Sequence, residues 1–127
     1  MAFITIDPSL PDPVHTQIVA QIEAAIENGD LAIGASLPTV RQLARDLRIA
    51  PNTVVRAYAT LQEQHWIVSD RRRGTKVSKH RPKSALSDRL KKLRAAVDRL
   101  VETHIYRGYS PDQIGDALDS VRKGLRT

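Results

Sequence analysis

Cysteine is absent from all 127 residues of the chain, which excludes a disulfide framework and any thiolate metal site. The remaining metal-binding candidates are four histidines, His15, His65, His80 and His104. Their spacing fits no metal-ligand pattern. We therefore expect the protein to hold no metal.

Aromatic residues are few: one Phe, one Trp and three Tyr. Trp66 lies in a β-prone run at residues 65–70, and we expect it to pack in the core. Tyr106 and Tyr109 flank a glycine near the C-terminus and are expected to pin a bend between two helices.

Long apolar runs are missing as well. No stretch approaches the roughly 18 apolar residues of a membrane-spanning helix, and the N-terminus lacks the basic start and apolar core of a signal peptide. A cytoplasmic protein without a membrane partner is expected. No nucleophile beside a base, phosphate-binding loop or acid pair is present, so we expect neither an enzyme nor a cofactor.

Basic residues are missing from the first 40 positions, which hold five acidic residues. Residues 41–94 hold fifteen Lys or Arg and four acidic residues, a net charge of +11. Residues 95–127 hold five of each sign, and the whole chain carries +6. Positive charge concentrated on one segment is typical of a nucleic-acid-binding protein.

Two short helices separated by a tight break are predicted in the basic region. Thr39 followed by Gln42 is a capping-box pattern for the first helix. Residues 48–51 form the break, and Pro51 suits the first position of the second helix. Ala50, the residue before it, offers no side-chain acceptor to cap that helix. The apolar positions expected to be buried are Val40, Leu43 and Leu47 in the first helix and Val54, Ala57, Tyr58 and Leu61 in the second.

The start of the second helix is predicted to point Asn52, Thr53, Val55 and Arg56 outward. Small polar side chains and an arginine at this place are typical of a helix that reads bases in the major groove. Arg56 is best suited to pair with both acceptors of a guanine. Val55 either touches a thymine methyl group or is simply exposed.

Arginines of the first helix are candidates for phosphate contacts. We expect Arg41, near the start of that helix, to bind a phosphate, which positions a protein without reading sequence. The alternative is a surface ion pair with Asp46 or Glu63. For Arg45, one turn further on, both possibilities stay open.

A hairpin is predicted from two β-prone runs, residues 65–70 and 75–78, around an arginine-rich turn. An arginine at such a tip can enter a narrow minor groove. Three adjacent arginines cannot all point one way, so one or two of them are expected to contact DNA. The alternative is that this charge keeps a sheet edge from pairing with another chain. The candidate residues of this wing are Arg71, Arg72, Arg73, Gly74 and Thr75.

The segment before the helix pair contributes a β-prone run at residues 3–6 and a helix from Pro13 to Asn28. Leu31 and Ile33 are expected to close one end of the core. The predicted fold is mostly α (α+β), a winged helix-turn-helix domain. The apolar stripe of the helix comprises Val14, Ile18, Ile22, Ala25 and Ile26.

The C-terminal third carries two further helices, the second of which begins with an N-cap and capping box at Ser110 and Gln113. Two short helices bury too little surface to be stable alone, so we expect a second copy of the chain to cover them. The predicted organisation is a DNA-binding domain at 1–78, a linker at 79–83 and a helical dimerisation unit at 84–127. The expected interface residues are Leu86, Leu90, Leu93, Val97, Leu100, Ile114, Leu118 and Val121, and the same seams continue through His104 and Leu125.

Over residues 13–77 the sequence resembles the DNA-binding domain of the GntR family of bacterial transcription regulators. The motifs that carry the resemblance are GDL with G and LP at 29–38, TVRQLA at 39–44, PNTVVRAY at 51–58 and RGT at 73–75. With so short a C-terminal part, the chain is similar to the small YtrA-like subfamily. The resemblance implies a two-helix dimerisation unit and a repressor role. It also implies DNA contacts by Arg41, Asn52, Thr53, Arg56, Arg73, Gly74 and Thr75.

The expected function is therefore a homodimeric repressor that reads an inverted-repeat operator in double-stranded DNA. Two alternatives remain from the sequence. One is a general architectural DNA-binding protein, and the other is a regulator whose helical unit senses a small-molecule effector.

Overall fold

The computed structural model describes residues 4–79 and 85–125, the side chains of residues 85 and 86 excepted. Backbone contacts divide the chain into two compact units, residues 1–83 and 84–127. Of the linker expected at 79–83, only Lys79 falls among the described residues.

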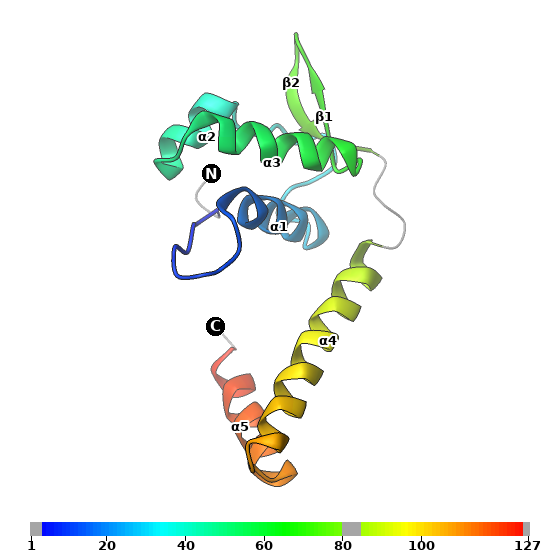
Figure 1. Cartoon of the computed structure of the whole chain (residues 1–127). Coiled ribbons are helices and arrows are strands. Elements are labelled where there is room, and N and C mark those ends of the chain that lie inside the picture. Colours follow the sequence, from blue (N-terminus) through cyan, green and yellow to red (C-terminus); the bar gives the residue numbers. More distant parts are fainter. Residues whose placement is uncertain (1–3, 80–84, 126–127) are drawn as a thin grey trace. The chain divides into compact units, whose positions relative to one another are not determined.

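Residues 4–79 form three helices followed by an antiparallel hairpin, which confirms the predicted winged helix-turn-helix fold. Helix α3 packs on both α1 and α2, and the hairpin adjoins the C-terminal end of α3 (Figure 1). The elements are α1 (Val14–Glu27), α2 (Val40–Leu47), α3 (Pro51–Glu63), β1 (Ile67–Asp70) and β2 (Gly74–Val77).

The hydrophobic core of this unit lies between α1 and α3. Ile18, Ile22 and Ile26 of α1 are fully buried, as their spacing predicted, while Val14 is only half-buried. Trp66 is buried as well, as expected. Each such side chain stabilises the fold by roughly 1.5–3 kcal/mol relative to leaving it exposed. The face of α3 is buried as predicted, through Val54, Ala57, Tyr58 and Leu61.

Helix α2 is buried less completely than predicted. Leu43 is fully buried, but Val40 and Leu47 are only half-buried, and Ala44 is buried in their place. Helix α2 has only about two turns and packs on α3 through its middle, so its first and last residues stay partly exposed to solvent.

The turn after α1 differs from the prediction, because Ile33 is 53% exposed and does not close the core. The backbone here pairs with β2 instead: the amide of Gly34 donates to the carbonyl of Val77 (3.0 Å), and the amide of Leu37 donates to that of Thr75 (2.8 Å). These bonds bring Leu37, rather than Ile33, into the core.

The β-prone run at the N-terminus forms no strand in its described part, since residues 4–6 pair with no strand. The backbone of this segment forms hydrogen bonds with the side-chain amides of two glutamines of α1 instead. Gln21 accepts from the amide of Thr5 (3.0 Å) and donates to its carbonyl (2.7 Å). Gln17 does the same for Asp7, at 2.9 and 3.0 Å.

Tyr58 links α3 to the start of α2. Its hydroxyl donates a hydrogen bond of 2.7 Å to the carbonyl of Pro38, and its side chain is buried. Burial raises the pKa of this phenol above its ordinary value of 10.0, because the charged form loses solvation.

This shift predicts a loss of stability at high pH. Above about pH 10 the unfolded chain releases the Tyr58 proton first, so the free energy of unfolding falls as pH rises. The stability that the buried Tyr58 phenol contributes is fully present below about pH 10. It is lost as the pH rises towards the pKa of this phenol in the folded protein. Urea unfolding at about pH 8 and about pH 11 should show a larger loss for the native chain than for Tyr58→Phe. Equal losses in both proteins would contradict the prediction.

The second unit consists of α4 (Ala85–Tyr106) and α5 (Pro111–Gly124). The turn between them contains Gly108 with φ of 97°, a conformation that suits glycine. The predicted capping box of α5 is confirmed, since Ser110 and Gln113 exchange bonds of 3.1 and 2.9 Å. Within the described residues, no helix is both long and apolar enough to cross a membrane.

Candidate nucleic-acid interface

The turn between α2 and α3 is built from local backbone signals. Arg48 adopts the left-handed conformation with φ of 55°, and the amide of Ile49 donates to the carbonyl of Ala44 (3.0 Å). Pro51 opens α3, and Ala50 supplies no side-chain cap, as predicted. In the first turn of α3, Pro51 has no amide hydrogen and the amide of Thr53 donates to the carbonyl of Ala50 (3.0 Å). A helix N-terminus favours an anion.

The outer face of α3 presents the residues predicted to read bases. Asn52 and Arg56 are exposed, and Val55 is 46% exposed. Thr53 is only half-buried rather than fully outward. Over its first twelve residues α3 carries no acidic side chain, so this face does not repel a phosphate backbone.

Three arginines form one stripe beside this face. Arg41, Arg45 and Arg48 follow steps of four and three residues and line a hollow of about 460 Å³ that ends at Pro51. Among the described residues, no hydrogen bond or ion pair engages their guanidinium groups. Arg48 did not figure among the sequence candidates, although its spacing from Arg41, at i+7, was the signal that could have found it.

The wing positions its arginines through its own hydrogen bonds. The amide of Arg72 donates to the carboxylate of Asp70 (2.8 Å), which fixes the tip, and Arg71, Arg72 and Arg73 are all exposed. Gly74 has φ of 76°, so a side chain there would be strained.

The hydroxyl of Thr75 is engaged within the protein. Its side-chain oxygen lies 3.0 Å from that of Ser69, across the β1–β2 pair, and the amide of Gln62 on α3 donates to Ser69. Gln62 and Ser69 thus connect the wing to α3. Sequence reasoning missed both, because neither belongs to a motif.

Comparison with known proteins shows which family shares this sequence and fold. The model of the family described as bacterial regulatory proteins, gntR family, matches residues 15–77. A solved structure, YtrA from Sulfolobus acidocaldarius, a GntR-family transcription factor, is 32% identical with a TM-score of 0.61. The alignment covers 75% of this chain and 98% of that one. The chain belongs to the GntR family.

Two curated relatives from Bacillus subtilis (strain 168) match almost end to end. This GntR chain is 27% identical to the HTH-type transcriptional repressor YtrA over 123 residues, 97% of this chain and 95% of the relative. It is 30% identical to the uncharacterized HTH-type transcriptional regulator YhcF over 117 residues, 91% of this chain and 88% of the relative. The GntR protein is thus a YtrA-type, DNA-binding transcriptional regulator and not an enzyme.

The C-terminal unit of this GntR regulator exposes much of its apolar surface. Ile114 is buried, while Tyr106, which was expected to pin the bend, is 85% exposed, so that prediction is wrong. Tyr109 does contact the ring of His104, with centroids 5.8 Å apart. The side chain of Leu86 lies outside the described residues. The other predicted interface residues are exposed in the isolated chain: Leu90, Leu93, Val97, Leu100, Leu118 and Val121.

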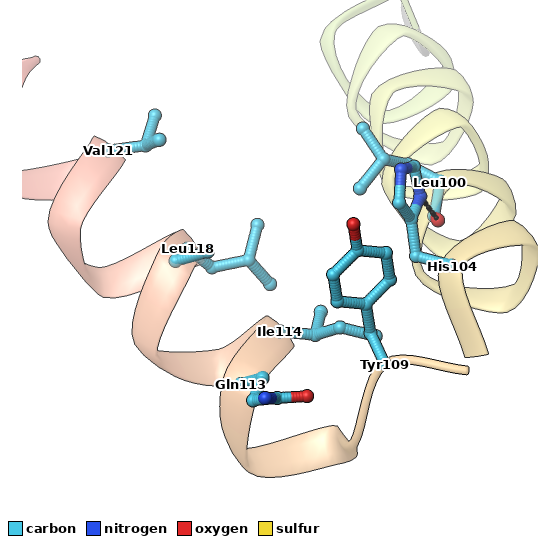
Figure 2. A pocket seen from close by; sticks show the side chains of 8 residues that line it. Leu100, His104, Tyr109, Gln113, Ile114, Leu118 and Val121 are labelled. Carbon is cyan, nitrogen blue, oxygen red and sulfur yellow. Dashed lines mark hydrogen bonds between the residues drawn. The ribbon is translucent and has the colours of Figure 1, made fainter. Parts of the chain in front are cut away.

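A cavity of about 520 Å³ opens between α4 and α5. In Figure 2, Leu100 and His104 of α4 face Tyr109, Ile114 and Leu118. His104 is held by a contact of 2.8 Å between its Nδ1 and the carbonyl of Leu100. The cavity is therefore continuous with the exposed apolar seam.

Proposed function

We propose that this GntR regulator is a homodimeric repressor that binds an inverted-repeat operator and occludes a promoter. The observation that carries the proposal is the exposed, acid-free face of α3, flanked by the arginine stripe and the wing. The repressor name of the Bacillus subtilis relative YtrA supports the direction of regulation.

The proposed base contacts lie on α3. Arg56 pairs with guanine, Asn52 pairs with adenine, and the half-buried Thr53 adds a contact at the helix start. The arginine stripe of Arg41, Arg45 and Arg48 binds phosphates, which sets the orientation of α3 in the groove. The wing, with Arg71, Arg72, Arg73, Gly74 and Thr75, follows the adjacent minor groove, where Gly74 permits close backbone approach.

The proposed dimer covers the apolar seam of α4 and α5. Exposed leucines and valines at four- and three-residue steps, from Leu90 to Leu100, form the side that a second helix pair packs against. The partner also fills the cavity, since Leu100 and Leu118 belong to both the seam and the cavity lining. A two-fold dimer then presents two recognition helices to two half-sites.

An effector-responsive regulator is the second candidate, because about 520 Å³ is within the range of small-ligand sites. A compound that binds the folded dimer raises its melting temperature. If the partner chain fills the cavity, thermal-shift screening of metabolites with the dimer produces no such rise.

Selection of DNA from a random pool tests the main proposal. We expect the purified protein to enrich one sequence with two-fold symmetry, whose half-site centres lie about one helical turn, or a multiple of it, apart. Enrichment of no particular sequence would instead indicate a general architectural protein, whose specificity ratio is close to unity.

A further inference from the structure

We infer that Val55 determines specificity by reading the methyl group of a thymine in each half-site, an assignment that rests on the proposed function. Val55 lies one turn after Asn52 and directly before Arg56, on the face proposed to enter the major groove. Its side chain is 46% exposed, while that of its neighbour Val54 is fully buried. The two adjacent valines therefore serve different surfaces, one the core and one the DNA-facing side of α3.

The surroundings of Val55 leave space for a base edge. The residue one turn further along the same face, Ala59, is exposed and carries only a methyl group. Asn52, one turn before, is short and polar. No long or acidic side chain of α3 stands on this face between Asn52 and Ala59 apart from Arg56, which is itself a proposed base contact. A base edge can thus approach the Val55 methyl groups directly.

Thymine is the base that this chemistry selects. Among the four bases, only thymine presents a methyl group in the major groove, and an apolar side chain is its matching contact. Hydrogen bonds from Asn52 and Arg56 identify bases by their polar edges, but the methyl group offers no polar atom. Val55 supplies the apolar contact that the two polar residues cannot.

Deoxyuridine provides a test that changes a single methyl group. In the selected operator, each thymine of a half-site is replaced in turn by deoxyuridine, and binding is measured for the native chain and for Val55→Ala. We expect one position at which the native chain loses about fourfold in affinity, the equivalent of one buried methylene-sized group. At that position, Val55→Ala should bind thymine and deoxyuridine DNA equally.

Two further variants test whether the sensitivity to deoxyuridine depends on the methyl groups of Val55. Val68→Ala removes a valine of β1 that is 53% exposed, and should keep the full fourfold sensitivity. Val55→Thr keeps one methyl group and should retain part of the sensitivity. Because Val55 is half exposed, its variants are expected to fold, which their circular dichroism and melting curves verify.

The possible failures are distinguishable. If the native chain binds the operator specifically but no thymine position is sensitive, the inference on Val55 is overturned while the proposed function stands. The same holds if Val55→Ala shows the native sensitivity. If the native chain prefers no DNA sequence at all, both the function and the inference fall.

Discussion

Replacing Leu93 by glutamate is expected to lower the affinity for the operator by about 100-fold or more, because linked half-site binding gains about 10²–10⁴ over a single domain. Leu93 is 61% exposed in the isolated chain and lies in the middle of the α4 seam. A glutamate there buries an unpaired charge at the proposed dimer interface, a strongly destabilising change. Sedimentation equilibrium should show monomers, and gel-shift titration should show weak binding.

Ala95→Glu is the matched control for this substitution. Ala95 is an exposed residue of the same helix, two positions from Leu93 and off the seam. The Ala95→Glu substitution adds the same charge to α4, and we expect this variant to stay dimeric and to keep its native affinity for the operator. A Leu93→Glu protein that stays dimeric and binds with native affinity would show that α4 does not form the interface.

Replacing Arg56 by alanine is expected to lower operator affinity by roughly 1–3 kcal/mol, or about 5- to 160-fold, the usual discrimination of a bidentate contact to a guanine. Affinity for random DNA should change little, because Arg56 is proposed to contact a base and not the backbone. Fluorescence anisotropy with operator and random duplexes at one salt concentration measures both values.

Arg45→Ala is the contrasting variant. Arg45 belongs to the arginine stripe, so its loss should weaken binding to operator and random DNA alike. The slope of log affinity against log salt should also become shallower by about 0.9. Equal losses on both DNAs for Arg56→Ala would mean that Arg56 also binds phosphate, and the assigned base contact would be wrong.

Much of the fold was predictable because its signals are local. The buried face of α3 follows from a 3.6-residue period, and both capping boxes follow from residues three positions apart, Thr39 with Gln42 and Ser110 with Gln113. The exposure of Asn52, Val55 and Arg56 followed in turn, since residues of a two-sided helix that are not in the core are exposed. These arguments need no knowledge of distant parts of the chain.

The features that were missed depend on contacts between distant segments. Ile33 and Leu37 are equally apolar, and only the backbone pairing with β2 decides that Leu37 is buried. The contact of 3.0 Å between the hydroxyls of Thr75 and Ser69 likewise depends on the pairing of β1 with β2, which no motif indicates. Arg48 was overlooked because it lies just beyond the end of α2, although it lines the same hollow as Arg41 and Arg45.

Two glutamines of α1 match the residue spacing of the helix to that of the extended N-terminal arm. Gln17 and Gln21 are four residues apart, a rise of about 6.0 Å along a helix. Thr5 and Asp7, which they bind, are two residues apart, about 6.6 Å along an extended chain. The spacings are nearly commensurate, so both amides are satisfied together. A shift of the arm by one residue would turn its backbone groups away and leave the buried Gln17 with only its bond to the carbonyl of Asp12 (3.1 Å), so these two side chains set the register of the N-terminal arm.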